Sequence, residues 1–229
     1  MSVHAPLPSG PELLGAPASF GHDEAALNAI REVIEAGRVA SKRAWTPATS
    51  GNFSVRVDLD RIAITRSGVD KGALTTSDVL IQPLDAPLAP GSSAEAALHA
   101  RRYRDADDVG AIFHIHGLAS AVIGRAHVAE GAVRIQGWEL QKALAGVKTH
   151  EATIETPVFA NDQDVAALAL RVSERFASPA SDGAVRAPGY LLAGHGLYAW
   201  GRDAIEAVRH LEALETLFQQ ILNLRSYRP

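Results

Sequence analysis

Residues 111–117 read Ala-Ile-Phe-His-Ile-His-Gly, an apolar run that ends in two histidines and a glycine. A short apolar run bounded by a turn residue is typical of a strand that is buried on at least one side. On a strand, residues i and i+2 point to the same face and lie about 6.5–7 Å apart along the backbone. We therefore expect a strand over residues 109–116 that presents His114 and His116 together where it opens into a loop, the usual place for a functional site.

These two histidines are spaced for binding one metal ion. Two imidazoles on the same face can converge on a single ion at Zn–N distances of about 2.0–2.1 Å. A third candidate, His195, stands between two glycines, where the backbone can turn sharply or approach a ligand closely. Three neutral imidazoles leave one tetrahedral position open, which is the arrangement of a catalytic zinc. The alternative is that His114 and His116 are only polar core residues at a strand end.

The other six histidines show no comparable pattern. His4 and His22 fall in the N-terminal region, and we expect His127 and His210 to face solvent. His99 and His150 are left without an assignment. The chain has no cysteine, so any metal site must be built from histidine, aspartate or glutamate.

Hydrophobic periodicity predicts further helices and strands on both sides of the histidine strand. We expect a helix that is capped by Asp23 and runs to about Arg43, and a long closing helix that begins at Asp203. The order of elements indicates a layered α/β domain, and the strand order does not follow from it. The remaining expected strands are 52–58 and 61–65 (a hairpin), 79–81, 153–159, 190–193 and 197–200, and the remaining helices are 92–105, 117–125, 138–144 and 161–176.

The length and composition are those of one folded domain. The chain has 229 residues, of which 47% are hydrophobic and 21% charged, so a single core can form without disulfides. Residues 1–21 hold four of the twelve prolines and three glycines, and we expect them to form a flexible N-terminal tail. Residues 22–229 are then expected to form the catalytic domain.

The charge and hydropathy patterns exclude several classes of partner. The formal net charge is −4, whereas a nucleic-acid-binding protein would need a basic face. The N-terminus has neither the basic start nor the apolar core of a secretory signal. No run approaches the ~18–20 apolar residues that a membrane span requires. We therefore expect a cytoplasmic protein with no nucleic-acid or membrane partner.

Several separate motifs, in order, resemble those of the class II aldolase/adducin family. They are Ser92-Ser93, His114-x-His116 and Gly194-His195-Gly196, and the similarity extends over about residues 23–225. The resemblance implies a single three-layer α/β domain, class II aldolase-like, with a central, largely antiparallel nine-stranded sheet flanked by helices. It also implies one Zn2+ per subunit, held by His114, His116 and His195, and a homotetramer with its sites near subunit contacts. Imidazole sites also accept iron, cobalt or nickel.

The resemblance further implies a phosphate cradle made of three pairs of small residues. Loop amides, asparagine side chains and serine hydroxyls can donate to phosphate oxygens, and a helix beginning near Ser92 would add its positive end. Any one such pair is more often a plain turn, but three of them in family order favour the cradle. Lys71 could add charge to the same pocket or could be solvated. The implied phosphate-binding residues are Gly51, Asn52, Ser67, Gly68, Ser92 and Ser93.

Four longer segments resemble one subgroup of the family, the dehydratases of methionine salvage. That resemblance implies a zinc-dependent hydro-lyase that converts 5-methylthioribulose 1-phosphate to 5-methylthio-2,3-dioxopentyl phosphate and water. The metal would polarise the keto group beside the carbon that loses its proton. The segments are residues 46–54, 137–144, 161–164 and 194–201.

Two glutamates compete for the proton-transfer role. Glu139 lies where the dehydratase subgroup carries its proton-transfer residue, and Glu95 lies where the aldolases of the family carry an acid/base carboxylate. One carboxylate could take the proton from C3 and then donate it to the departing C4 hydroxyl, so Glu139 could serve both steps. Glu95 is expected to assist at or near the metal. Outside these motifs, either residue would be an ordinary solvated glutamate.

Two other functions remain open. An aldolase or epimerase that acts on a pentulose or deoxyhexulose phosphate would need the same metal ligands, so the histidines cannot separate it from a dehydratase. A non-catalytic interaction module like the adducin head resembles the same fold but lacks the histidines. All three are present here, which disfavours that alternative.

Overall fold

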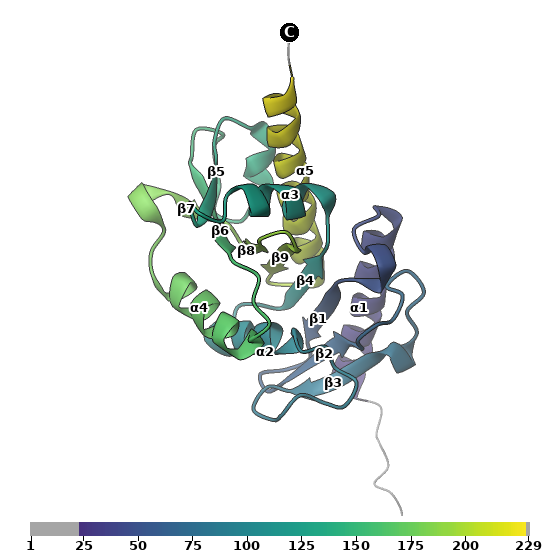
Figure 1. The fold of residues 1–229 in the computed structure, drawn as a ribbon. Coiled ribbons are helices and arrows are strands. Elements are labelled where there is room, and N and C mark those ends of the chain that lie inside the picture. Colours follow the sequence, from purple (N-terminus) through teal and green to yellow (C-terminus); the bar gives the residue numbers. More distant parts are fainter. Residues whose placement is uncertain (1–22, 228–229) are drawn as a thin grey trace, which may run out of the picture.

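The computed structural model describes residues 23–227, which form a three-layer α/β arrangement around a nine-stranded sheet (Figure 1). The strands are β1 (Asn52–Arg56), β2 (Arg61–Thr65), β3 (Val79–Pro83), β4 (Ala111–Ile115), β5 (Ala132–Ile135), β6 (Ile154–Phe159), β7 (Val185–Arg186), β8 (Gly189–Leu192) and β9 (Gly196–Gly201). Their spatial order is β3-β2-β1-β4-β9-β8-β6-β5, with β7 also paired to β6. Every pair is antiparallel except β6–β7 and β6–β8. The predicted fold class is therefore confirmed.

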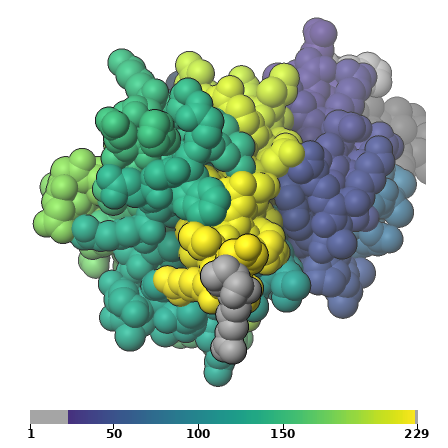
Figure 2. Space-filling model, turned by 90° about the horizontal axis from the view of Figure 1, so that it is seen from above, coloured from purple at the N-terminus to yellow at the C-terminus, as the bar shows by residue number. Residues whose placement is uncertain are grey.

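Helices cover both faces of the sheet. The α-helices are α1 (Glu24–Lys42), α2 (Ala96–Asp105), α3 (Leu118–Ala126), α4 (Val165–Ala177) and α5 (Ala204–Ser226), and short 3-10 turns occur at η1 (Pro47–Thr49), η2 (Thr76–Asp78), η3 (Glu139–Ala143) and η4 (Ser181–Gly183). Helices α1, α3 and α5 contribute Val33, Ile123 and Leu214 to one core cluster. Helices α2 and α4 pack together over a second cluster. Figure 2 shows α5 between α1 and the segment that holds η3.

Strand β4 lies near the centre of the sheet and is buried on both faces. Phe113 and Ile115 belong to the first cluster, whereas Ile112 belongs to the second. His114 shares the face of Ile112, because side chains alternate along a strand, and its ring stacks on Tyr198 of the second cluster. The predicted strand therefore presents a fully buried histidine to the layer that contains α2.

The helix boundaries follow from local capping. As expected, the carboxylates of Asp23 and Asp203 accept hydrogen bonds from the amides of Ala26 (3.2 Å) and Glu206 (2.7 Å), which fixes the starts of α1 and α5. Helix α4 begins later than predicted because Asp164 caps it by accepting from the amide of Ala167 (3.0 Å). Likewise, α2 begins at Ala96, and the predicted helix at 138–144 is only the 3-10 turn η3. Strands β5 and β7 were not predicted.

The structure contradicts some of the predictions made from the sequence, and other predictions concern residues that it does not describe. The prediction that His210 faces solvent is wrong: its side chain is buried, with Nδ1 2.6 Å from the carbonyl oxygen of Trp200. His127 is also mostly buried, with a side chain 17% exposed. The predicted tail at 1–21, with His4 and His22, lies outside the described residues. Between residues 23 and 227, no helix has both the length and the apolar character of a membrane span.

Candidate metal centre and active site

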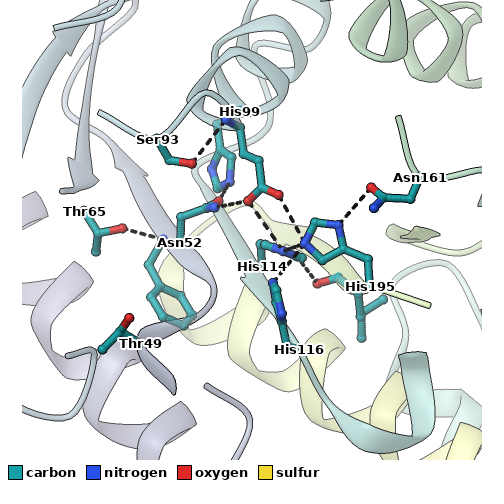
Figure 3. Close-up of polar contacts among 12 residues, drawn as sticks. Thr49, Asn52, Thr65, Ser93, His99, His114, His116, Asn161 and His195 are labelled. Atoms are coloured by element: carbon teal, nitrogen blue, oxygen red, sulfur yellow. Dashed lines mark hydrogen bonds and ion pairs between the residues drawn. The ribbon is translucent and has the colours of Figure 1, made fainter. Parts of the chain in front are cut away.

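Strand pairing brings the three predicted histidines together. His114 lies on β4, His116 follows that strand directly, and His195 lies in the turn between β8 and β9. Strands β4 and β9 are antiparallel neighbours with Ile115 opposite Leu197, so this turn meets the end of β4. One nitrogen of each imidazole lies within 4.8 Å of the others, and Figure 3 shows the three rings facing one point.

Glycine on each side of His195 is required by the backbone. Gly194 has φ +67°, a conformation that costs other residues strain. At Gly196, an added Cβ would lie 1.9 Å from the carbonyl oxygen of Ile115. A side chain at this position would separate β9 from β4 and move His195 away from the other two rings.

Two of the histidines have their protons on the nitrogen that faces away from the centre. Nδ1 of His114 lies 3.1 Å from the carbonyl oxygen of Leu197, which can only accept, so Nδ1 carries the proton and Nε2 is bare. Nδ1 of His195 donates in the same way to Oδ1 of Asn161 (3.1 Å). This is the outer-shell arrangement that orients metal-binding imidazoles.

The ring nitrogens that face the centre are spaced nearly like the corners of a coordination tetrahedron. Nε2 of His195 lies 3.3 Å from Nε2 of His114 and 2.9 Å from Nε2 of His116. Zn–N bonds of ~2.0–2.1 Å imply nitrogen–nitrogen separations of about 3.3–3.4 Å. The bare nitrogens of His114 and His195 face each other at 3.3 Å, and two lone pairs at this distance repel unless a cation lies between them. The donor set therefore fits a divalent metal ion.

Burial keeps the imidazoles of His114 and His116 neutral. It lowers the pKa of His114 well below the usual range of a histidine and lowers the pKa of His116 to about 4. Neutral imidazole is the form that binds metal. The buried environment thus limits the competition between protons and a metal for these nitrogens.

The carboxylate of Glu95 lies beside the three histidines. Its Oε1 is 3.1 Å from Nε2 of His195, and its Oε2 is 3.7 Å from Nε2 of His114. Burial raises the pKa of Glu95, but the close contact with His195, the neighbouring His114 and the hydrogen bond from Asn52 lower it further, so the pKa lies well below the usual range. Glu95 is therefore an ionised group beside the candidate metal centre, where it could bind an ion or accept a proton.

A cleft of about 420 Å³ opens onto the histidines and contains most of the predicted cradle. Ser92 does not line it, and the buried hydroxyl of Ser92 has no hydrogen-bond partner among the described residues. A phosphate group bound among the cradle residues would accept hydrogen bonds from their backbone amides and hydroxyls. The predicted cradle residues that do line it are Gly51, Asn52, Ser67, Gly68 and Ser93.

One cleft residue with an obvious role was missed from the sequence. Arg66 lines the cleft next to Ser67 and Gly68, and its Nε donates to the carbonyl oxygen of Ser77 (2.9 Å). A guanidinium beside a Ser-Gly turn is well suited to bind phosphate. The position of Arg66, directly after an alternating strand and before Ser-Gly, was the signal that could have identified it.

Lys71 does not donate into the cleft but supports the loop that forms one wall. Its ammonium is buried and donates to the carbonyl oxygens of Thr49 and Val69, both at 2.7 Å. Thr49 and Ala48 have φ values of 63° and 51°, which are unusual for residues other than glycine. Two consecutive left-handed residues need such support, so Lys71 helps to hold the wall in place.

Glu139 is not brought to the histidines within one chain. It begins η3, its side chain is 73% exposed, and it does not line the cleft. It pairs with Lys142 and lies 3.7 Å from Nδ1 of His150. The hydrogen bond and the charge of Lys142 lower the pKa of Glu139. Any chemistry of Glu139 at a histidine centre therefore needs a neighbouring copy of the chain.

Comparison with known proteins identifies the family. Residues 31–222 match the family described as the class II aldolase and adducin N-terminal domain. The chain belongs to the class II aldolase/adducin family. The resemblance drawn from the motifs is therefore confirmed, and the three histidines of those motifs are the group that could bind a metal here.

Relatives within the class II aldolase/adducin family differ in their named reactions. A methylthioribulose-1-phosphate dehydratase of a Bradyrhizobium species is 60% identical over 205 residues, which cover 90% of this chain and 95% of that protein. One from Parvibaculum lavamentivorans is 46% identical and covers 87% of this chain and 96% of that one. The structure of L-fuculose-1-phosphate aldolase from Thermus thermophilus has a TM-score of 0.68 and 29% identity, covering 89% and 96% of the two chains.

Proposed function

We propose that this chain catalyses the dehydration of 5-methylthioribulose 1-phosphate to 5-methylthio-2,3-dioxopentyl phosphate, a hydro-lyase reaction of methionine salvage. The observation that carries this proposal is the 60% identity, over 90% of the chain, to a protein named methylthioribulose-1-phosphate dehydratase. The histidine centre and the polar cleft supply what such a reaction needs.

We propose Zn2+ as the metal, one ion per subunit, held by His114, His116 and His195. The all-nitrogen donor set and the open fourth position support this choice. When bound, the ion would polarise the C2 carbonyl and make the proton on C3 more acidic. Mass spectrometry of the purified protein under native conditions measures the metal and its stoichiometry.

The phosphate of the substrate would bind at the side of the cleft that holds Arg66, Ser67 and Gly68. The guanidinium supplies the positive charge, and the hydroxyls and amides of this turn and of Ser93 donate to phosphate oxygens. With the phosphate bound there, C2 and C3 would extend toward the histidines, because His116 and His195 line the same cleft.

The reaction needs one proton to move twice. A base removes the proton from C3, the same group donates it to the C4 hydroxyl, and the hydroxyl leaves as water. The resulting enol then gains a proton at C4 and loses one from its C3 hydroxyl to give the diketone. We propose that Glu139 carries the first two transfers and that Glu95, which already lies beside the histidines, assists there.

We propose a homotetramer in which Glu139, whose side chain is exposed, enters the site of a neighbouring subunit. Mixing Glu139→Gln subunits with His195→Asn subunits tests this arrangement. If Glu139 acts between subunits, random hybrids regain up to about a quarter of the wild-type activity, because one site in four combines both intact parts. If Glu139 acts within its own chain, no hybrid is active. Full activity of Glu139→Gln, with normal zinc content, would contradict the assignment.

Product analysis tests the reaction itself. Zinc-loaded protein incubated with 5-methylthioribulose 1-phosphate is expected to give a product lighter by one water. Chelated protein and the His116→Asn variant are the controls, and both should be inactive.

The alternative reaction is aldol cleavage of a pentulose or deoxyhexulose phosphate. It is favoured by the 29% identity to an L-fuculose-1-phosphate aldolase and by the position of Glu95 at the histidines. Release of an aldehyde fragment, rather than loss of water, would identify it.

A further inference from the structure

A line of buried polar side chains runs behind the candidate metal centre to the carboxylate of Glu95. The Tyr103 hydroxyl lies 3.0 Å from the Ser54 hydroxyl, which lies 2.7 Å from Nδ1 of His99. Nε2 of His99 lies 2.5 Å from Oδ1 of Asn52, and Nδ2 of Asn52 donates to Oε2 of Glu95 at 2.6 Å (Figure 3). All of these side chains except Glu95 are at most 3% exposed.

The acceptor at one end fixes the direction of every hydrogen bond in this line. In the structure Asn52 turns its NH2 group toward the carboxylate oxygen of Glu95 and its own oxygen toward His99, which is the orientation that a carboxylate acceptor requires. His99 therefore donates from Nε2, and its bare Nδ1 accepts the proton of the Ser54 hydroxyl. That hydroxyl has no second proton, so Tyr103 donates to Ser54, either to Oγ or to the backbone oxygen at 3.1 Å.

Asn52 depends on His99 for its orientation. The two ends of an amide have nearly the same shape, and a rotation of half a turn would present the oxygen of Asn52 to the carboxylate of Glu95. The two oxygens would repel, and Glu95 would lose its shortest hydrogen bond. Only the Nε2–H of His99 contacts the oxygen of Asn52 among the hydrogen bonds of residues 23–227.

We propose that His99 is a positioning residue: its Nε2–H fixes the amide of Asn52, which in turn holds the carboxylate of Glu95 against His195 and His114. The inference rests on the proposed function insofar as it gives Glu95 a role in the reaction. In this proposal the side chain of Asn52 holds the carboxylate of Glu95 and does not bind the phosphate, although Asn52 lines the cleft.

A matched pair of variants separates positioning from simple filling of space. Phenylalanine at position 99 keeps the ring that packs edge-on against Tyr198, at 5.6 Å between centroids, but neither donates nor accepts. Glutamine can do both. We expect His99→Phe to lower kcat about 10- to 100-fold, as loss of an outer-shell partner typically does, with KM and zinc content little changed. We expect His99→Gln to recover most of kcat. Equal losses in both variants would overturn the proposal.

A double-mutant cycle shows whether His99 acts through Glu95. In a Glu95→Gln background, His99→Phe should cause no further loss of kcat, because the group that it positions is already altered. Independent, multiplicative losses would overturn the proposal. Tyr103→Phe, at the far end of the line, is the control. Its kcat should remain near that of the wild type, because the Ser54 hydroxyl can still donate its hydrogen bond to Nδ1 of His99.

A measurement without turnover keeps this inference separate from the proposed function. In metal-free protein, ¹⁵N–¹H correlation spectra of the imidazoles should show His99 as the neutral tautomer with its proton on Nε2. A proton on Nδ1 would overturn the positioning role whatever the enzyme does. If Glu95→Gln were fully active while the Nε2–H tautomer was observed, the catalytic role of Glu95 would fail and the oriented line of hydrogen bonds would stand.

Discussion

At the residue scale, several imidazoles are buried in their neutral form, and this makes the fold sensitive to acid. Burial lowers the pKa of His99 to about 3, from about 6.5 in an unfolded chain. Between these two values the unfolded chain holds a proton that the folded chain does not, so acid favours unfolding. Above pH 6.5 neither state holds that proton, and stability does not change on account of His99.

Replacing His99 with glutamine should therefore flatten the acid side of the stability curve. Between about pH 6 and pH 4, the free energy of unfolding of the wild type should fall more steeply than that of His99→Gln, by up to about 1.4 kcal/mol per pH unit. Urea denaturation of the metal-free proteins at a series of pH values measures this slope. Parallel curves would show that His99 titrates alike in both states.

Lys71 is a second residue whose replacement has a defined consequence. Lys71→Met leaves the carbonyl oxygens of Thr49 and Val69 without their donor and should destabilise the fold by about 1–3 kcal/mol. Because Thr49 lines the cleft, KM for the substrate should rise while zinc content stays normal. Lys148→Met, at an exposed position, is the control and should change neither value. An unchanged KM would contradict the role of Lys71 in holding the cleft wall.

At the element scale, α5 supports the start of α3, which directly follows β4 and His116. The buried carboxylate of Glu215 accepts from the amides of Ala119 (3.0 Å) and Ser120 (3.2 Å), which α3 itself leaves unpaired. A Cβ at Gly117 would lie 2.4 Å from this carboxylate. The chain can therefore leave His116 and enter α3 only because residue 117 is glycine.

Substitutions at these two positions should be strongly coupled. Gly117→Ala should cost about 1–3 kcal/mol through the clash, and Glu215→Ala a similar amount through the lost acceptors. The double variant should cost clearly less than the sum, because removal of Glu215 also removes the clash. Urea unfolding of all four proteins measures the coupling, and simple additivity would contradict the contact.

The elements that could be predicted from the sequence are those with a strong local signal. The apolar run before His114 predicted β4, and Asp23 and Asp203 predicted the starts of α1 and α5. Strands β5 and β7 were missed because four and two residues are too few for a periodic pattern. The late start of α4 was missed because the capping role of Asp164 depends on the conformation of the residues before it.

The site was predictable only in part, for the same reason. Spacing along the chain and flanking glycines pointed to the three histidines, and the structure does bring them together. His99 could not be assigned, because its partners Asn52 and Ser54 lie 47 and 45 residues away along the chain. Arg66 and Lys71 likewise gain their roles from loops that meet only in the folded chain.

At the scale of the whole molecule, the central sheet brings together two segments, distant along the chain, that both contribute residues to the candidate site. Strand β4 lies between β1, which carries Asn52, and β9, which follows His195. This neighbourhood is not sequential, so the sequence order of the strands could not predict it. A metal that binds all three histidines would bind only the folded chain, and it should therefore stabilise the whole fold.

Removing the metal should lower thermal stability by an amount set by its concentration. At 100 times its dissociation constant, Zn2+ should add about 2.7 kcal/mol to the free energy of unfolding. Thermal unfolding with added Zn2+ or with a chelator measures the effect. His116→Asn should remove the difference, whereas His150→Asn, at an exposed histidine, should retain it. A difference that persists in His116→Asn would contradict the assigned ligand set.

The aromatic stacking behind the histidines provides an optical reporter of metal loading. The ring of His114 lies 3.9 Å from that of Tyr198 at an interplanar angle of 12°, and Tyr198 in turn stacks on Tyr190 at 4.7 Å and 7°. A cation drawn to one end of this column changes the electric field across both phenols, and their near-ultraviolet absorption shifts with it. Binding of a colourless ion such as zinc could thus be titrated by difference spectroscopy, with no substrate present, and replacing Tyr198 with phenylalanine would weaken the signal.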